Sequence, residues 1–325
     1  MILHENKSLF NDAVRFTAQQ MNLPPAYVEK DYWVTFALYT IFNNEAGKDT
    51  IFKGGTALSK CHNIINRFSE DIDLVVMRKY GETDSKLKSK LKVISKCIES
   101  VLPEIEIKGI TNKMGMNRKT AHNYNKVFDG NFIQIRDVIV LESTWLGYYE
   151  PYTQKKIISF VGKMMINNNQ AEIAEANQLT PFEVQALEPT RTLCEKIMSL
   201  VRFSYSINPI EDLRKKIRHT YDLNQLLKQE EILTFLNSDQ FGIILLRVAQ
   251  DDVVSFKNNN KWLLHHPTES LIFKDLESTW NEIKNTYLGE FRNLVYGEFP
   301  NEKTIFETLK LIQNRLTGIQ WEVTL

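Results

Sequence analysis

The chain has 325 residues, of which 43% are hydrophobic and 25% are charged, and this balance is typical of a globular protein. Its length accommodates one large domain or two of ordinary size. Forty basic residues balance forty acidic ones, so the net charge gives no sign of a polyanionic partner.

The sequence predicts a cytoplasmic protein that does not associate with a membrane. Its N-terminus lacks the basic stretch and apolar stretch of a signal peptide. No run approaches the roughly 18–20 apolar residues that cross a bilayer. Cys61, Cys97 and Cys194 are widely spaced and odd in number, which argues against a disulfide framework or a structural zinc site.

Two N-terminal helices are predicted, over 9–21 and 27–43, and Pro24-Pro25 separates them. A mixed region follows, with a long helix at about 83–101. Its predicted strands lie at about 50–53, 71–77, 104–110 and 132–143.

Prolines at 181 and 189 then punctuate the chain, and almost all of the sequence after them has the apolar spacing of helices. The predicted segments are 190–204, 210–228, 232–237, 239–250, 268–287 and 301–316. We therefore predict an α+β fold, in which a small mixed β-sheet with flanking helices precedes a mostly α-helical C-terminal half.

A glycine pair marks the first candidate site. Gly54 and Gly55 follow the strand at 50–53 and precede an apolar, helix-like run. Two residues without Cβ let the backbone turn sharply and bring its N–H groups close to an anion. Thr56 is then predicted at the start of the helix, where its hydroxyl can cap the helix and the helix dipole favours phosphate.

Two aspartates mark the second candidate site. Asp71 and Asp73 are two residues apart in a predicted strand, so both carboxylates project from one face of the sheet. Together they can hold Mg²⁺, which prefers oxygen ligands. A lone Asp-x-Asp is common and more often caps a turn or faces solvent, and the preceding Gly-Gly-Thr turn is what favours a site for nucleotidyl transfer.

These motifs resemble the nucleotidyltransferase superfamily typified by DNA polymerase β and, within it, the AbiEii/AbiGii toxin family. That family pairs a Gly-Gly-Ser/Thr turn with an Arg-x-Ser-x-Asp-Ile-Asp strand, as in Gly54-Gly55-Thr56 and Arg67 to Asp73 here. Three further stretches match family motifs. They are Glu29-Lys30-Asp31-Tyr32-Trp33-Val34, Leu193-Cys194-Glu195-Lys196-Ile197 and Arg218-His219-Thr220-Tyr221-Asp222-Leu223.

The resemblance implies a third carboxylate that shares the metal and helps to take a proton from the acceptor. Glu142 is the candidate because it ends the apolar run 138–141, beside the first two aspartates. The alternative is a strand-terminal glutamate in solvent.

The resemblance also implies that the helical half folds over the nucleotide and contributes Lys196 and Asp222 to the site. Lys196 would neutralise triphosphate charge, and Asp222 would orient Lys196 or the acceptor. Spacing alone favours an ordinary ion pair on a helix surface. Many relatives have an aspartate at the position of His219, whose role stays open.

The implied organisation is a nucleotidyltransferase domain with N-terminal helices over 1–180 and a helical domain over 181–325. The implied reaction is attack by an acceptor hydroxyl on the α-phosphate of a nucleoside triphosphate, which releases pyrophosphate. Asp71, Asp73 and Glu142 would bind Mg²⁺ or Mn²⁺. The predicted nucleotide-binding residues are Lys53, Gly54, Gly55, Thr56, Lys60, Arg67 and Ser69.

A basic excess follows the aspartates. Residues 78–136 contain thirteen Lys or Arg and six Asp or Glu. This segment could bind a nucleic-acid acceptor, with Tyr124 and Asn125 available for stacking or hydrogen bonding beside Lys119 and Lys126. The alternative is a solvated, lysine-rich helix.

Three functions are consistent with these residues. The family resemblance implies the toxin of a bacterial toxin–antitoxin or phage-defence pair, with an antitoxin partner and, in some relatives, the tRNA acceptor end as substrate. A small-molecule nucleotidyltransferase would use the same carboxylates with another acceptor pocket. A non-catalytic nucleotide-binding module is the third, and intact Asp71 and Asp73 argue against it.

Overall fold

The computed structural model describes residues 1–129 and 136–325. The chain divides into two compact units, the second of which takes in two short segments from within the first. The first, which we call the sheet unit, comprises Met1–His62, Phe68–Trp145 and Tyr152–Leu187. The second, which we call the helical unit, comprises Asn63–Arg67, Leu146–Pro151 and Glu188–Leu325.

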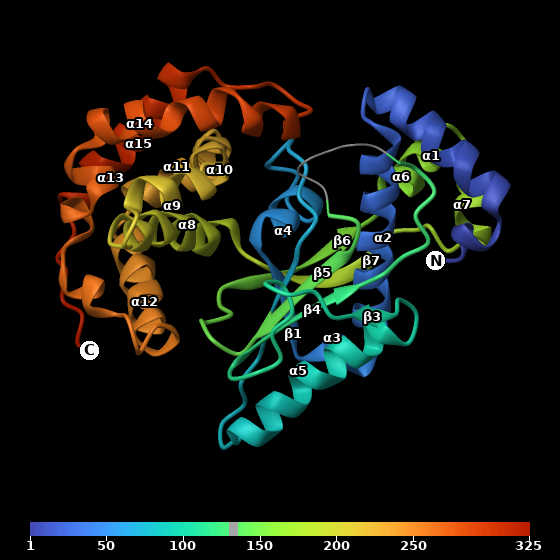
Figure 1. The fold of residues 1–325 in the computed structure, drawn as a ribbon, viewed down its shortest axis with the longest axis horizontal. Coiled ribbons are helices and arrows are strands. Elements are labelled where there is room, and N and C mark those ends of the chain that lie inside the picture. The colour runs from blue at the N-terminus through green and yellow to red at the C-terminus, as the bar shows by residue number, and fades with distance from the viewer. Residues whose placement is uncertain (130–135) are drawn as a thin grey trace. The chain divides into compact units, whose positions relative to one another are not determined.

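The described strands form one mixed sheet in the order β3-β4-β5-β2-β1-β7-β6 (Figure 1). β2 is antiparallel to β1 and parallel to β5. The strands are β1 (Thr50–Lys53), β2 (Ile72–Val76), β3 (Glu104–Ile105), β4 (Asn117–His122), β5 (Ile139–Thr144), β6 (Tyr152–Ile157) and β7 (Phe182–Leu187). This mixed sheet with flanking helices confirms the predicted α+β fold.

The middle of the sheet is its most apolar part. Ile51, Phe52, Leu74, Val75 and Leu141 are buried, as β-branched and aromatic side chains are in a strand that is covered on both faces. Polar residues occur where these strands begin or end, and the register between strands therefore decides which polar side chains meet.

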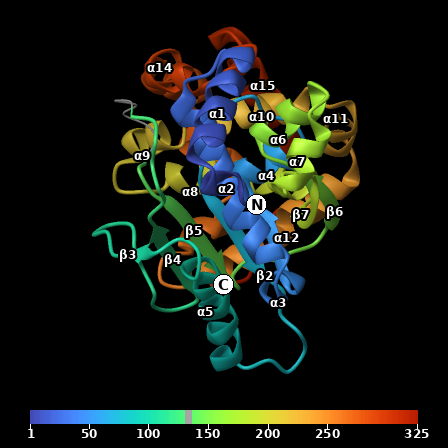
Figure 2. The ribbon, with the colours of Figure 1, turned by 90° about the vertical axis from the view of Figure 1, so that its right-hand side faces the viewer.

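The helices of the sheet unit are α1 (Lys7–Met21), α2 (Pro25–Phe42), α3 (Glu45–Lys48), α4 (Gly54–Lys60), α5 (Asp84–Glu99), α6 (Phe160–Asn167) and α7 (Ala171–Ala176), with the 3₁₀ turn η1 (Leu3–Glu5). α2 begins at Pro25, as the Pro24-Pro25 pair predicted, and it is buried along most of its length. α2 and α5 contact each other, and Figure 2 shows α5 below α2.

The helical unit confirms the predicted α-helical C-terminal half. Its helices are α8 (Pro189–Ser204), α9 (Pro209–Lys215), α10 (Arg218–Leu227), α11 (Glu230–Asn237), α12 (Asp239–Ser255), α13 (Leu271–Lys274), α14 (Leu276–Leu288) and α15 (Glu302–Leu316), with 3₁₀ turns η2 (Lys261–Leu264), η3 (Pro267–Glu269) and η4 (Glu290–Leu294). α8 packs against α9, α10 and α12.

Several element predictions were wrong in extent. The predicted helix 210–228 is two helices, α9 and α10, and only Glu104–Ile105 of the predicted strand 104–110 is a strand. β5 begins at Ile139, and residues 132–135 of the strand predicted there lie outside the described residues. β4 and β6 were missed because each carries Lys and other polar residues at most positions.

In the described part of the chain, no individual helix combines the length and apolar character of a membrane span. Among these same residues, only α11 and α12 taken together reach that length and composition, and the two helices are bent by 82° at the break between them.

Candidate active site

The glycine turn between β1 and α4 lies directly against Asp73. Gly54 has φ +81°, a backbone conformation that side chains other than glycine rarely adopt. A Cβ built on Gly54 would lie 2.2 Å from Asp73 Oδ2, well inside contact distance. Position 54 therefore requires glycine for two independent reasons, its backbone conformation and its close approach to a candidate metal ligand.

Gly54→Ala is expected to lower the rate of nucleotidyl transfer about 100-fold, because the added methyl group displaces the Asp73 carboxylate. Gly109→Ala is the matched control, since Gly109 has φ +84° and a Cβ added there would meet no atom within 4 Å. Both variants carry the backbone strain, of about 1–2 kcal/mol. Single-turnover rates and thermal unfolding of the two proteins separate strain from displacement, and equal losses of rate in both would contradict this interpretation.

Thr56 does not cap the helix, which corrects the sequence prediction. α4 begins at Gly54 directly after β1, with Lys53 as its N-cap residue, so Thr56 is already the third helical residue. Its hydroxyl instead donates a hydrogen bond of 2.6 Å to the carbonyl oxygen of Asp71 and lies 3.0 Å from Ser69 Oγ. Thr56 therefore ties the glycine turn to the residues that lead into β2.

Three carboxylates gather where β2 begins. Asp73 and Glu142 are register partners on the parallel strands β2 and β5, so their side chains project from the same face of the sheet. Asp71 directly precedes β2. Burial, together with the negative charges of Asp71 and Glu142, raises the pKa of Asp73 to about 7. The cluster is thus crowded enough that one member resists ionisation.

Basic and amide groups contact the two outer carboxylates. Arg136 Nη1 donates a hydrogen bond of 2.5 Å to Asp71 Oδ1. Asn117 Nδ2 donates to Glu142 Oε1 at 3.0 Å, and Lys119 Nζ lies 3.1 Å from Glu142 Oε2. Burial disfavours the ionised form of Glu142, but Asn117 and Lys119 outweigh it and hold the pKa of Glu142 below its ordinary value.

The donor chemistry of this cluster fits a hard divalent cation, because every donor is a carboxylate oxygen. Among residues 1–129 and 136–325, no three His, Cys, Asp or Glu side chains are already arranged as a complete ligand group for a metal. Magnesium in nucleotide sites is commonly held by one or two carboxylates, with substrate phosphates and water completing the shell. Asp71 and Asp73 meet that smaller requirement.

α2 holds the backbone of the chain at residues 136 and 138 through Lys30. Lys30 is fully buried, and its Nζ donates to the carbonyl oxygens of Val138 and, at 2.6 Å, Arg136. The same ammonium lies 3.4 Å from Glu70 Oε2. Glu70 Oε1 accepts a hydrogen bond of 3.2 Å from the Arg136 backbone N–H. The backbone at Arg136 is therefore fixed at both its N–H and its carbonyl group.

The neighbours of Lys30 on α2 make further long-range contacts. Glu29 accepts hydrogen bonds of 2.8 and 2.9 Å from the backbone N–H groups of Val127 and Phe128. Asp31 pairs with Lys60 Nζ at 2.5 Å and accepts a hydrogen bond of 2.7 Å from the Phe160 N–H. Lys60, a predicted phosphate partner, is thus largely buried in an ion pair.

Lys53, another predicted phosphate partner, ends β1 opposite Asp73. The two residues are cross-strand partners, and the positive charge of Lys53 acts against the rise in the pKa of Asp73. Lys53 is half-buried. Of Lys53 and Lys60, the two lysines predicted to bind phosphate in the sheet unit, Lys53 is therefore the one placed beside Asp73.

The helical unit contains a separate buried ion cluster centred on Asp222. Arg67 Nε and Nη2 donate to Asp222 Oδ1 and Oδ2 at 2.6 and 2.7 Å, and Lys196 Nζ lies 2.7 Å from Oδ2. Burial opposes ionisation of Asp222, but the charges of Arg67 and Lys196 outweigh it and hold the pKa of Asp222 well below its ordinary value. The helical unit thus brings together three residues that were singled out on separate motifs.

The segment that carries Arg67 is part of the helical unit because its backbone bonds to that unit on both sides. The Asn66 N–H donates to the Tyr221 hydroxyl at 3.3 Å, and the Asn66 carbonyl accepts from the Tyr296 N–H at 3.0 Å.

Burial lowers the pKa of His219 well below its ordinary value, so this side chain is neutral at pH 7. The contribution of Lys196 and Asp222 to nucleotide binding stays a prediction.

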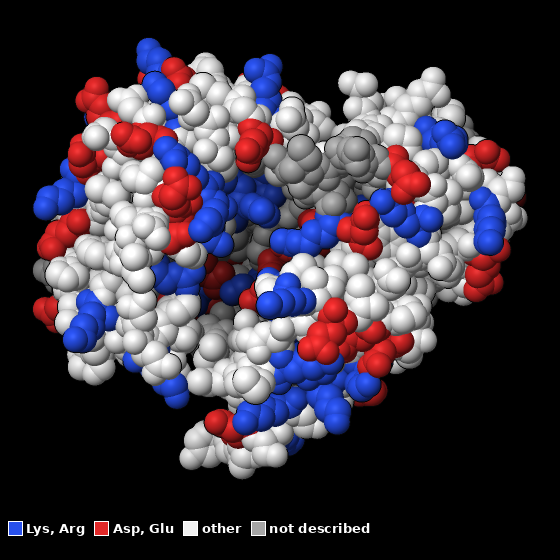
Figure 3. Space-filling model, in the orientation of Figure 1, with Lys and Arg blue, Asp and Glu red and all other residues white. Residues whose placement is uncertain are grey.

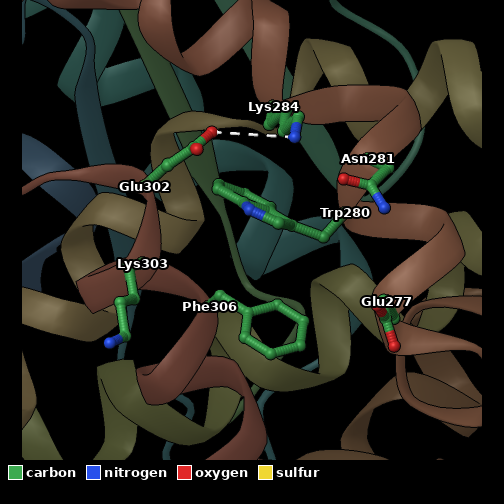
Figure 4. Close-up of a pocket in the computed structure, with 7 residues that line it drawn as sticks. All are labelled: Glu277, Trp280, Asn281, Lys284, Glu302, Lys303 and Phe306. Atoms are coloured by element: carbon green, nitrogen blue, oxygen red, sulfur yellow. Dashed lines mark ion pairs between the residues drawn. The ribbon is translucent and has the colours of Figure 1, made fainter.

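Two surface hollows are formed by the described residues, and they differ in their suitability for nucleotidyl transfer. The first, of about 200 Å³, lies between α14 and α15 in the helical unit, where Trp280 and Phe306 face each other near the Lys284–Glu302 ion pair (Figure 4). It contains no group of carboxylates suited to nucleotidyl transfer. The second, which we call the basic groove, has a volume of about 420 Å³ and lies in the sheet unit. Its lining is Lys88, Leu91, Lys92, Lys113, Met114, Gly115, Asn117 and Arg118.

Sequence reasoning missed Asn117 and Arg136 as individual site residues. Both lie in or at the end of the basic segment, but neither belongs to a motif, and their partners are 25 and 65 positions away in the chain. These contacts become apparent only from the register of β4 on β5 and from the hydrogen bond of Lys30 to the Arg136 carbonyl oxygen.

The mixed sheet, its glycine turn and its carboxylates are the features of a nucleotidyltransferase fold. A family model described as "Nucleotidyl transferase AbiEii toxin, Type IV TA system" matches residues 37–306. The chain therefore belongs to the AbiEii nucleotidyltransferase toxin family, as its motifs predicted, and this membership supports a nucleotidyltransferase that acts as a toxin and has an antitoxin partner.

Among solved structures, the chain resembles the nucleotidyltransferase toxin MenT4 of Mycobacterium tuberculosis, with 14% identity, a TM-score of 0.47 and coverage of 92% of this chain and 98% of that one. It also resembles JHP933 from Helicobacter pylori, with 16% identity, a TM-score of 0.45 and coverage of 90% and 94%. No curated protein sequence matches the chain.

Proposed function

We propose that this protein transfers a nucleoside monophosphate from a nucleoside triphosphate to a hydroxyl group of RNA, with the 3′ end of tRNA as the first candidate, in a reaction that depends on Mg²⁺ or Mn²⁺. The observation that carries the proposal is the packing of the Gly54 turn against Asp73, at the point where Asp71 and Glu142 also gather. A phosphate-binding turn and a carboxylate cluster in contact are what transfer of a nucleotide requires.

Each group of residues has a distinct role in this proposal. Asp71, Asp73 and Glu142 hold the cation, which when bound neutralises charge on the phosphates and activates the attacking hydroxyl. The turn from Gly54 to Thr56 and the neighbouring Ser69 bind the β- and γ-phosphates, and Lys53 adds a positive charge beside them. Glu142 also takes the proton of the acceptor hydroxyl, and its hydrogen bond from Asn117 holds it in position.

The basic groove supports RNA as the acceptor. Lys88 and Lys92 extend from α5 into the groove, and Arg118 lies across from them on β4. Asn117 lines the groove and its side-chain amide also donates to Glu142, so one residue of the groove contacts the carboxylate cluster. Blue side chains gather over α5 in Figure 3. A groove of this charge suits a phosphate backbone better than a neutral small molecule.

The charge of the groove is not merely that of a lysine-rich helix, because the basic residues that line the groove come from three segments of the chain. Lys113 lies in the loop before β4, where it pairs with Glu104, and Arg118 Nε donates to Ser95 Oγ on α5 at 2.7 Å. A small-molecule acceptor is the second candidate, since a volume of about 420 Å³ is within the usual range of ligand pockets.

Reversing the charge of the groove tests the acceptor. Lys88→Glu/Lys92→Glu is expected to lower the rate of label transfer to RNA by about 10- to 100-fold and to reduce its dependence on salt concentration. Lys86→Glu/Lys96→Glu is the matched control, because it places the same charge change on exposed positions of α5 outside the groove. Equal losses in both variants would show an effect of overall charge and would contradict a specific role of the basic groove in binding RNA.

Toxicity is tested by induced expression in a bacterial host. We expect growth arrest by the intact protein, and normal growth when Asp73→Ala is expressed to the same level. Co-expression of the cognate antitoxin is expected to restore growth. Harmless expression of the intact, folded protein would contradict the toxin role.

A further inference from the structure

We propose that Arg136 is a competing cation that contacts Asp71 until a divalent ion binds, and that its guanidinium then moves from Asp71 to the phosphates of the nucleotide. The inference rests on the proposed function, because it takes Asp71 as a metal ligand. It assigns a role to a residue that no motif contains.

Arg136 directly contacts a candidate metal ligand. Arg136 Nη1 donates to Asp71 Oδ1 at 2.5 Å, and the same nitrogen lies 3.6 Å from Glu70 Oε1. A carboxylate that is paired with a guanidinium attracts a second cation less strongly, because the two positive charges repel each other across a few ångströms. Arg136 therefore opposes binding of a metal ion at Asp71.

The backbone of Arg136 is held more firmly than its side chain. The backbone is held by Lys30 at the carbonyl and by Glu70 at the N–H, and Lys30 is fully buried. The side chain is 40% exposed. An arginine with a fixed Cα and an exposed head can change partner without any movement of the chain, which a residue that only fills the interior cannot do.

The local charge balance distinguishes Asp71 from the other two carboxylates. Lys119 and Asn117 contact Glu142, and Lys53 lies opposite Asp73, so each of the other two carboxylates has a basic or amide neighbour on the sheet itself. Asp71 obtains its basic contact from Arg136, outside the strands. Loss of this contact is therefore the smallest change that would open the cluster to an ion and supply a guanidinium for a triphosphate.

Titration of the nucleotide-free protein with Mn²⁺, followed by electron paramagnetic resonance of the free ion, tests the inference without relying on activity. Arg136→Gln is expected to bind Mn²⁺ about three- to tenfold more tightly than the intact protein. Arg136→Lys keeps the positive charge and is expected to bind Mn²⁺ nearly as the intact protein does.

Arg15→Gln is the matched control, because it removes the same charge from an exposed arginine of α1 whose described contacts are Asn11 and the Phe128 ring. Unchanged Mn²⁺ affinity in Arg136→Gln, or equal tightening in Arg15→Gln, would overturn the inference and leave the proposed function intact. Failure of the intact protein itself to bind Mn²⁺ at millimolar concentration would instead contradict the metal site of the proposed function.

Binding of nucleotide gives a second, independent readout. With Ca²⁺ present, which occupies oxygen sites, equilibrium dialysis of each of the four nucleoside triphosphates is expected to show about three- to tenfold weaker binding to Arg136→Gln than to the intact protein. Tighter metal binding combined with weaker nucleotide binding is the pattern of a residue that changes partner. If Arg136 were merely structural, Arg136→Gln would weaken binding of both the metal ion and the nucleotide, and that outcome would overturn the inference.

Discussion

Replacing Asp222 with alanine is expected to lower the free energy of unfolding of the helical unit by about 3–5 kcal/mol. Asp222 is fully buried, and it is the carboxylate that Arg67 and Lys196 share. Without it, two positive charges remain 1% and 7% exposed beside each other. Removal of one member of a buried ion pair costs this much because the remaining charge is neither hydrated nor paired.

Urea unfolding followed by circular dichroism measures the effect, and Asp212→Ala is the matched control. Asp212 pairs with Lys215 at the surface of the same unit, so its loss is expected to leave stability nearly unchanged. Replacing all three charged residues, as in Arg67→Met/Lys196→Met/Asp222→Leu, is expected to recover most of the stability. A normal unfolding midpoint for Asp222→Ala would contradict the buried cluster.

Replacing Asp73 with asparagine is expected to lower nucleotidyl transfer by at least about 10³-fold and, at pH 8, to stabilise the protein. The loss of rate follows from removal of a charged oxygen ligand at the centre of the carboxylate cluster. The gain in stability follows from the pKa of Asp73, which is about 7 in the folded protein and 3.8 in an ordinary aspartate.

A raised pKa in the folded state means that the protonated carboxyl is favoured there. Its contribution to stability is therefore fully present below pH 3.8 and is lost as the pH rises through 7. The full shift corresponds to about 4 kcal/mol, and screening at this half-buried side chain reduces the expected loss to about 1–2 kcal/mol. Asparagine does not ionise, so the variant escapes this loss at pH 8 and gains nothing at pH 4.

Thermal unfolding of the metal-free protein between pH 4 and pH 8 measures this difference. Asp12→Asn, at an exposed position of α1, is the matched control and is expected to show no such dependence on pH. An equal difference between Asp73→Asn and the intact protein at pH 4 and pH 8 would contradict the raised pKa.

The glycine turn and the aspartates of the candidate site could be singled out from the sequence because their signals are local. Gly54 and Gly55 interrupt an apolar strand, and Asp71 and Asp73 are two residues apart at the start of another, so the turn and the carboxylates could be located without a fold. The position of Glu142 depended only on β5 pairing with β2, and the register of these strands sets Glu142 beside Asp73.

The remainder depends on contacts between distant parts of the chain. β4 lies near the edge of the sheet, where Arg118 lines the basic groove and Lys119 pairs with Glu142, so it carries basic residues instead of the usual apolar alternation. Its pattern therefore did not predict a strand. Arg136 contacts Asp71 from a backbone position that Lys30, 106 residues away in the chain, and Glu70 hold by hydrogen bonds. Neither composition nor periodicity contains that information.

Nucleotidyl transfer to RNA is tested most directly by incubating the purified protein with Mg²⁺, total bacterial RNA and each of the four α-³²P-labelled nucleoside triphosphates, alongside Asp71→Ala/Asp73→Ala. We expect label to enter RNA, with tRNA-sized RNA the first product to look for, and to do so only with the intact protein. Absence of label from RNA with all four nucleoside triphosphates, or equal labelling by the double variant, would contradict nucleotidyl transfer to RNA by this carboxylate cluster.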